Sequence, residues 1–140
     1  MEATDRRIVD LLRRDGRLSY TDLGKLLGLS TSAAHQRVRR LEERGVITGY
    51  TARIDAQQVG LPITAFMSVT PVDPGAADDI PERLRGLSEI EACYSVAGEE
   101  NYILKVRRGT PADLEDLIAR IRAAAAVSTR TTVVLSTPWE

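Results

Sequence analysis

Apolar residues in the first third of the chain recur at helical spacing in three short stretches. Ile8, Leu11 and Leu12 fall on one face of a helix over residues 5–15. The same periodicity predicts helices over residues 19–27 and 30–44. Small hydroxyl and acidic residues favour the N-cap of a helix, and glycine favours the position just past its end. The residues of these types at the expected ends are Thr4 or Asp5, Ser19 and Ser30 as caps, and Gly16, Gly28 and Gly45 as stops.

The second and third of these helices are separated by about three residues that include a glycine, which predicts a helix-turn-helix. Gly24 stands inside the second helix, where glycine is less favourable than alanine. We therefore expect a packing reason for it: without a side chain, it lets the third helix cross closely.

The third helix has an apolar and a polar face. Ala34, Val38 and Leu41 point the same way and are expected to face inward. The opposite face can read base edges, because glutamine pairs with adenine, arginine with guanine and serine with either. Such a face can also be merely solvated, but its place in a tight helix-turn-helix favours contact with DNA. The predicted DNA-contacting residues are Ser32, His35, Gln36, Arg37, Arg39 and Arg40, with Arg37 and Arg44 nearer the edge and so nearer to phosphates.

Residues 46–55, VITGYTARID, predict a strand or ribbon after the third helix, giving a winged helix-turn-helix. A turn over residues 57–60 follows, before Leu61-Pro62. We therefore expect a DNA-binding domain at residues 1–53, a linker at 54–61 and a second domain at 62–140.

The second domain has the element order β-α-β-β-α-β, which is the ferredoxin-like arrangement of an α+β fold. Alternation of apolar and polar residues predicts strands at 63–70, 90–97, 102–108 and 129–137. Helical spacing predicts helices at 78–87 and 111–125, and turns are expected at 73–75 and 98–101.

Both helices are expected to cover one face of the four-stranded antiparallel sheet and to leave the other face bare. That bare face carries apolar residues as well, Phe66 and Val134 among them. A partly apolar uncovered face favours self-association, and we expect at least a homodimer.

The composition narrows the function classes. The 140 residues are 43% hydrophobic and 28% charged, as in an ordinary globular protein, and no run is long or apolar enough for a membrane span. The charged N-terminus has no signal-peptide core, so we expect a cytoplasmic protein. The single cysteine, Cys93, excludes an internal disulfide, and with the single histidine, His35, it argues against a metal site. We expect neither metal nor cofactor.

A small enzyme on a ferredoxin-like fold is the alternative from another class. The sequence has no glycine-rich phosphate loop, no nucleophile with a histidine base and no metal cluster, so we expect no catalytic residues. Charge favours a nucleic-acid partner instead. Residues 1–53 hold 11 Lys and Arg against 7 Asp and Glu, a net +4, whereas residues 54–140 carry a net −5.

Several motifs resemble the Lrp/AsnC (feast/famine) family of bacterial transcription regulators. They are Asp5-Arg6-Arg7-Ile8, Leu12, Asp15-Gly16-Arg17, Leu23-Gly24, Leu29-Ser30, Arg37-Val38, Leu41-Glu42 and the run GVITGYTARID at residues 45–55. The resemblance covers essentially the whole chain. It implies dimers that pair through their sheets and assemble into octamers, and an amino-acid effector bound at the interface between dimers.

Residues 96–106, VAGEENYILKV, resemble the effector loop of that family, V-x-G-x-x-D-[YF]-x-L-x-V. Asn101 stands where the family has aspartate, so either Glu99 or Glu100 substitutes for that carboxylate or the effector preference differs. Glycine lets the backbone approach a ligand closely, and hydroxyls on the last strand are expected nearby. An ordinary hairpin turn is the other interpretation. The predicted effector-binding residues are Gly98, Glu99, Glu100, Asn101, Tyr102, Thr129 and Thr131.

These observations predict a sequence-specific, nucleoid-associated DNA-binding regulator whose assembly or DNA affinity responds to an amino acid. Its partners would be double-stranded DNA, read in the major groove at a roughly palindromic site, and a small amino-acid effector. The alternative is a nucleoid-type architectural DNA-binding protein without an effector.

Overall fold

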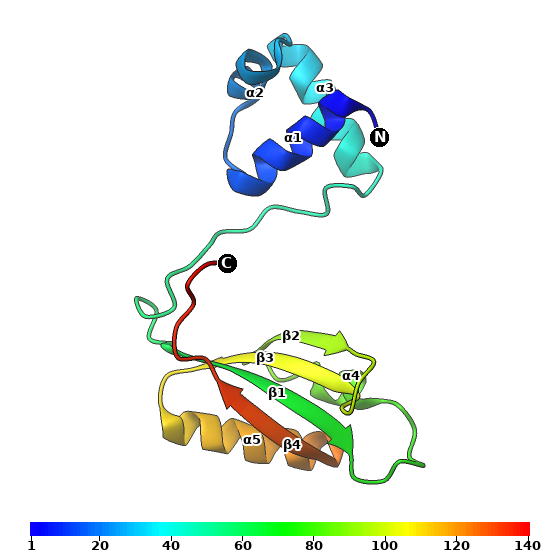
Figure 1. Ribbon diagram of the computed structural model, residues 1–140, viewed down its shortest axis with the longest axis vertical. Coiled ribbons are helices and arrows are strands. Elements are labelled where there is room, and N and C mark those ends of the chain that lie inside the picture. Colours follow the sequence, from blue (N-terminus) through cyan, green and yellow to red (C-terminus); the bar gives the residue numbers. More distant parts are fainter. The chain divides into compact units, whose positions relative to one another are not determined.

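The computed structural model describes all residues 1–140, and the chain divides into two compact units, Met1–Arg53 and Ile54–Glu140 (Figure 1). Each unit has its own hydrophobic core. Residues 54–61 fall within the second unit.

The first unit consists of three helices: α1 (Ala3–Arg14), α2 (Tyr20–Leu27) and α3 (Thr31–Glu43). The predicted helix-turn-helix is confirmed in α2 and α3. The apolar faces of the three helices meet in a small core, because each presents residues three or four positions apart to the others. The fully buried members are Ile8, Leu23, Ala34, Val38 and Leu41.

Two serines cap their helices as predicted. The Oγ of Ser19 accepts a hydrogen bond from the backbone N–H of Asp22 (3.0 Å), and the Oγ of Ser30 accepts one from Ala33 (3.1 Å). The cap prediction for the first helix is wrong, because α1 begins at Ala3 after Glu2, and no side chain caps it. Asp5 lies inside the first turn, and its carboxylate contacts Arg37 of α3 instead.

Gly24 lies against the backbone of the turn between α2 and α3. A Cβ placed on it would be 2.5 Å from the carbonyl oxygen of Leu29 and 3.3 Å from that of Ser30. The Leu29 N–H donates to the carbonyl oxygen of Gly24 (2.8 Å). The close approach predicted for Gly24 is therefore real, but it is made by the turn rather than by the body of α3.

No strand forms over residues 46–55, so that prediction is wrong. A strand needs a neighbouring strand to take its backbone hydrogen bonds, and this segment has none in the chain. The N–H groups of Val46 and Ile47 instead both donate to the carbonyl oxygen of Leu41, at 2.9 and 3.1 Å. Tyr50 also returns to the helices by donating to Glu42 Oε1 (3.4 Å).

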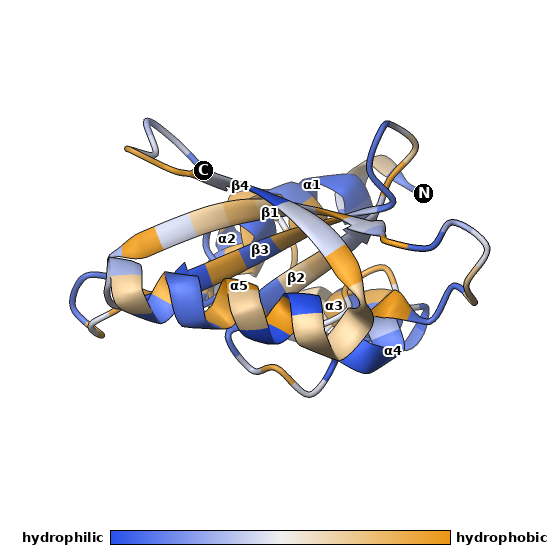
Figure 2. Cartoon of the chain, turned by 90° about the horizontal axis from the view of Figure 1, so that it is seen from below, coloured by the Kyte–Doolittle hydropathy of each residue, from blue (hydrophilic) through white to orange (hydrophobic).

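The second unit is a four-stranded antiparallel sheet with two helices, in the strand order β2-β3-β1-β4 (Figure 1). This confirms the ferredoxin-like prediction. Helices α4 and α5 cover one face, and apolar and polar segments alternate along α5 as expected of a helix with one buried side (Figure 2). The elements are β1 (Ile63–Pro71), α4 (Ile80–Leu84), β2 (Ile90–Ser95), β3 (Tyr102–Arg108), α5 (Pro111–Ala125) and β4 (Val127–Val133).

Four of these elements differ from their predicted bounds, β1 only by the additional residue Pro71. Helix α4 is shorter at both ends, β2 ends at Ser95, and β4 runs over Val127–Val133 instead of 129–137. The shift of β4 has a local cause. Ala126 adopts a left-handed conformation (φ 50°) that ends α5 in a single residue, so the chain enters the strand at once.

The second face of the sheet is open. Alternate residues of β1 point to it, and Phe66 among them is 38% exposed. On the neighbouring strands it carries the exposed Tyr94 together with charged residues such as Lys105. The expected bare, partly apolar face is present in the single chain.

Gly24→Ala is expected to destabilise the three-helix unit by about 1–3 kcal/mol, because the turn backbone has to move to admit the methyl group. Gly49→Ala is the matched control, since nothing lies within 4 Å of a Cβ there. The free energy of unfolding of the two variants, from denaturant titration followed by circular dichroism, measures this difference. Equal values for both variants would contradict the steric argument.

Candidate nucleic-acid interface and ligand-binding region

The outward face of α3 carries Ser32, Gln36 and Arg39, all exposed as predicted. Arg39 forms an ion pair with Glu43 one turn later, with Nε 3.1 Å from Oε1 and side chains 71% and 61% exposed. An exposed pair of this kind contributes little and opens readily. The guanidinium of Arg39 is therefore free to exchange its partner for a base.

His35 lies where α3 meets α2. Its ring packs on that of Tyr20, with centroids 4.5 Å apart and planes tilted by 43°. The imidazole stays exposed, so it keeps a polar edge for an external partner. Arg40, further along the helix, is exposed and has no ion-pair partner.

Arg37, predicted to lie near phosphates, differs from the other arginines of α3 because carboxylates of the same chain already hold it. Its Nη1 is 2.9 Å from Glu2 Oε2 and 2.9 Å from Asp5 Oδ1, and its side chain is only 24% exposed. Hydrogen bonds to Glu2 and Asp5 raise the pKa of Arg37. Two carboxylates therefore already neutralise the guanidinium, and a phosphate would have to displace them.

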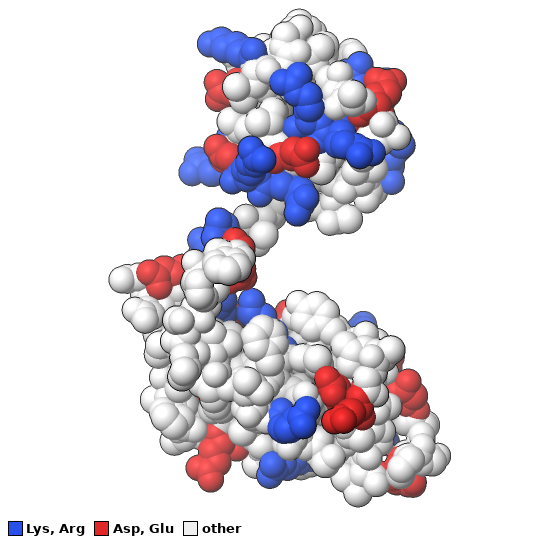
Figure 3. Space-filling view, in the orientation of Figure 1, with Lys and Arg blue, Asp and Glu red and all other residues white.

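Lys and Arg side chains gather on the visible face of the three-helix unit, whereas white and red surface dominates the visible face of the second unit (Figure 3). The net charge of +4 over residues 1–53 agrees with this distribution. A cationic surface that carries an exposed polar helix has the two properties that DNA binding requires, attraction to phosphates and side chains for base edges.

The loop after β2 is fixed at the end of β1. The Asn101 N–H donates to the carbonyl oxygen of Val69 (3.1 Å), and the Val96 N–H donates to that of Asn101 (3.1 Å). Gly98 sits in open space, with nothing within 4 Å of a Cβ placed on it. Beside this loop lies a cavity of about 180 Å³. Its lining residues are Ser68, Thr70, Glu99, Glu100, Ser128, Thr129 and Arg130.

The cavity contains three of the predicted effector residues: Glu99, Glu100 and Thr129. Gly98 and Asn101 belong to the loop but do not line the cavity, and Thr131 lies outside it. The Oγ1 of Thr129 already accepts a hydrogen bond from Arg122 Nε (2.9 Å).

Sequence reasoning missed the cationic side of this cavity. Arg130 lies opposite Ser68 in the register of β1 and β4, and Ser128 lies opposite Thr70. Ser68 and Thr70 alternate with the buried Met67 and Val69 and so point to the open face, and their register partners Arg130 and Ser128 point the same way. The alternation in β1 gave the outward positions of Ser68 and Thr70, but only the strand register places Arg130 beside them.

Tyr102, also among the predicted effector-binding residues, does not line this cavity. It alternates with Ile103 and points to the helix-covered face, where it is 8% exposed. Its hydroxyl donates to Asp78 Oδ1 (2.7 Å). This hydrogen bond and burial raise the pKa of Tyr102 to about 12.

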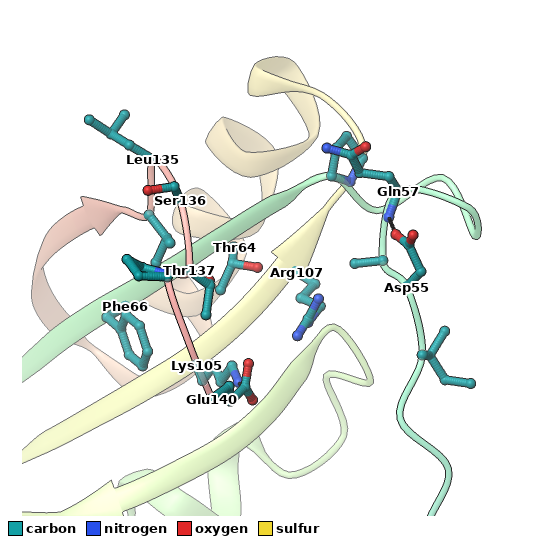
Figure 4. Close-up of a pocket in the computed structure, with 15 residues that line it drawn as sticks. Asp55, Gln57, Thr64, Phe66, Lys105, Arg107, Leu135, Ser136, Thr137 and Glu140 are labelled. Atoms are coloured by element: carbon teal, nitrogen blue, oxygen red, sulfur yellow. Dashed lines mark hydrogen bonds and ion pairs between the residues drawn. The ribbon is translucent and has the colours of Figure 1, made fainter.

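A larger hollow of about 710 Å³ lies over the open face near the C-terminus (Figure 4). The segment from Leu135 to Glu140 passes above Phe66 and Lys105. The cations of this hollow are already paired: Lys105 Nζ lies 3.4 Å from Glu140 Oε1, and Arg107 Nε lies 2.9 Å from Glu91 Oε1. The hollow therefore offers less uncompensated charge to a small ligand than the cavity beside Arg130.

No group of three or more His, Cys, Asp or Glu side chains is arranged to hold a metal ion. None of the helices has the length and apolar character needed to cross a membrane.

Comparison with known proteins gives matches to both units. Residues 1–48 match the family model of a winged helix-turn-helix DNA-binding domain, and residues 64–140 match that of the Lrp/AsnC ligand binding domain. The chain is 50% identical to the HTH-type transcriptional regulator LrpA of Mycobacterium tuberculosis, over 98% of this chain and 91% of the relative. It is 34% identical to the leucine-responsive regulatory protein of Escherichia coli, over 96% and 85%.

Two solved structures of related proteins superpose on nearly the full length of this chain. The feast or famine regulatory protein of M. tuberculosis, complexed with L-methionine, gives a TM-score of 0.96 at 49% identity, covering 99% of this chain and 95% of that one. AsnC of E. coli gives a TM-score of 0.86 at 26% identity, covering 100% and 95%.

The raised pKa of Tyr102 makes the folded second unit sensitive to high pH. Its folded-state value of about 12 lies above the value of ~10 for an unfolded tyrosine. The neutral hydroxyl therefore contributes its full stability below pH ~10, and this contribution is lost as the pH rises toward 12. Asp78→Asn removes the carboxylate charge and is expected to lower the pKa of Tyr102, as followed by NMR of ¹³Cζ-labelled tyrosine.

Asp79→Asn is the matched control, because the Asp79 carboxylate pairs with Arg83 (2.8 Å) and not with Tyr102. An unchanged Tyr102 titration in the Asp78 variant would show that the hydrogen bond is not its cause.

Proposed function

The chain belongs to the Lrp/AsnC family of transcriptional regulators, and from this premise we propose that it reads specific DNA sequences under the control of a bound amino acid. That it is a DNA-binding regulator with a ligand-binding domain follows from the two family matches. Its relatives are transcriptional regulators, which points away from an enzyme. The observation that carries the proposal is the cavity beside residues 98–101, where carboxylates and a guanidinium face the same small space.

In this proposal α3 enters the major groove. Gln36 reads adenine and Arg39 reads guanine, and the Ser32 hydroxyl can form a hydrogen bond with either base. His35 and Arg40 contact the DNA from the sides of the same face, Arg40 through phosphate. Arg37 is left out of this set because Glu2 and Asp5 hold it.

Two copies of the chain would present two reading helices. The open sheet face gives each chain a partly apolar surface to cover, and a symmetric dimer covers it on both partners. We propose such a dimer, with assembly into an octamer as the family resemblance implies. Its two α3 helices would read half-sites about 34 Å apart or a multiple of that, in a roughly palindromic operator. Residues 1–53 would bind DNA, and residues 62–140 would assemble the protein and bind the effector.

The effector cavity suits a free α-amino acid. Glu99 and Glu100 supply carboxylates for an α-ammonium group, and Arg130 supplies a guanidinium for an α-carboxylate. The relative bound to L-methionine supports this ligand class. With asparagine at position 101, the negative charge on this side of the cavity comes from the two glutamates.

The departure at Asn101 also favours a second candidate, an architectural DNA-binding protein without an effector. A panel of the twenty amino acids, followed by thermal shift, separates the two, because a ligand that binds only the folded state raises its stability. Absence of any response across the panel would favour the architectural function.

Arg39→Ala is expected to weaken the free energy of binding to the preferred DNA site by about 1–3 kcal/mol and to relax the preference for guanine at one base position. The measurement is the affinity for a set of duplexes that differ at single positions of a site selected by the wild-type protein. Arg13→Ala, an exposed arginine of α1, is the control and should leave base preference unchanged. An unaltered preference in the Arg39 variant would rule out its base-reading role.

Arg130→Met is expected to weaken binding of L-methionine about 10- to 100-fold, the effect of losing a hydrogen-bonded charge. Calorimetry with methioninamide, which lacks the carboxylate, isolates the contact: the wild type should prefer methionine, and the variant should bind both equally. Glu99→Gln combined with Glu100→Gln should remove the corresponding preference over N-acetylmethionine. Glu115→Gln on α5 serves as the control. A methionine preference that survives in Arg130→Met would place the carboxylate elsewhere.

A further inference from the structure

We propose that Arg37 is a positioning residue: by bridging Glu2 and Asp5 it fixes the orientation of α3 against the start of α1, so that the outward side chains of α3 meet the bases in register. The proposal builds on the sequence-specific reading proposed for α3. It assigns an arginine of the DNA-reading helix to a contact inside the protein.

The bridge joins two helices whose other contacts are apolar. Asp5 stands one turn before the buried Ile8, and Arg37 directly precedes the buried Val38. The ion pair therefore lies at the rim of the small core, where it adds a directional contact between α1 and α3 to the packing of the aliphatic side chains. Two hydrogen bonds of 2.9 Å from one guanidinium set a direction as well as a distance.

The two ion-paired arginines of α3 differ in how easily they can leave their partners. Arg39 and Glu43 are both largely exposed and belong to the same helix, so water readily replaces the contact. Asp5 is only 14% exposed, and loss of Arg37 would leave its carboxylate half-buried and unpaired. An approaching phosphate would add a further negative charge next to that carboxylate.

The energetics therefore favour different partners for the arginines of α3. Phosphates would be neutralised by the unpaired Arg40 and Arg44, and Arg37 would stay on α1. Base reading depends on positions held to within about 0.5 Å, whereas attraction of cations to phosphates tolerates larger displacements. Loss of the bridge should then damage discrimination between sequences more than it damages affinity for DNA in general.

The test compares Arg37→Met with Arg40→Met on two duplexes of equal length, one selected from a random pool by the wild-type protein and one unrelated. Fluorescence anisotropy over a KCl series gives the affinity and its salt dependence. Arg40→Met should reduce the slope of log K against log [KCl] by about 0.9 and weaken both duplexes by similar factors. Arg37→Met should leave the slope unchanged and lower the ratio of selected to unrelated affinity about tenfold, the effect of roughly one mismatched base pair.

Reversing the charges of the Arg37–Asp5 ion pair distinguishes a contact inside the protein from a contact with phosphate, because only the former can be restored by the reversal. Arg37→Glu combined with Asp5→Arg restores an ion pair between α1 and α3 but places a negative charge at position 37. We expect this double variant to recover much of the lost discrimination, and Arg37→Glu alone to lack it. A reduced salt slope in Arg37→Met together with no rescue by charge reversal would overturn the proposal.

A purely stabilising role of Arg37 would also overturn the proposal. In that case the affinities for both duplexes would fall by the same factor, in proportion to a loss of folded protein measured by circular dichroism. If Arg37→Met unfolds the three-helix unit, Arg37→Lys takes its place, since lysine keeps the charge but lacks the guanidinium fork. If the wild-type protein selects no sequence, the proposed specific reading fails, while the salt slopes on the unrelated duplex still decide whether Arg37 contacts phosphate.

Discussion

The first unit depends on a close contact between Gly24 and the backbone of the turn that follows α2. No side chain fits between Gly24 and the carbonyl oxygen of Leu29, and this contact fixes how the chain leaves α2 and begins α3. The direction of α3 in turn decides which of its residues are buried. Val38 points into the core, and Gln36, two positions earlier, points to solvent. The close approach at Gly24 and the apolar stripe of α3 together set which of its side chains face solvent.

The second unit follows a different logic, because its sheet is covered by helices on one side only. Residues that alternate along each strand are divided between a closed core and an open face, so polar side chains such as Ser68 and Arg130 can stand next to buried aliphatic ones. The antiparallel register brings β1 and β4 side by side, and the loop after β2 adds Glu99 and Glu100 at the end of these strands. Opposite charges from segments thirty residues apart in sequence therefore share one cavity.

Periodicity and capping chemistry predicted most of the fold, because both are local properties of the chain. The core of the three-helix unit, the caps at Ser19 and Ser30 and the order of elements in the sheet all follow from them. What the sequence did not predict depends on contacts between distant residues. From the sequence, Asp5 was a candidate N-cap of the first helix, but in the fold its carboxylate pairs with Arg37 of α3. Arg130 can be placed in the cavity only when the register of β4 against β1 is known. The strand expected over residues 46–55 does not form because no other segment of the chain pairs with it, which the local pattern could not reveal.

The left-handed residue Ala126 joins α5 to β4 without a loop. A conventional connection of several residues would absorb small displacements between a helix and the next strand. Here the end of α5 and the start of β4 are separated by one residue, so the position of the helix end constrains the position of the strand. Arg130, four residues beyond Ala126 and paired with Ser68 of β1, is held from both sides.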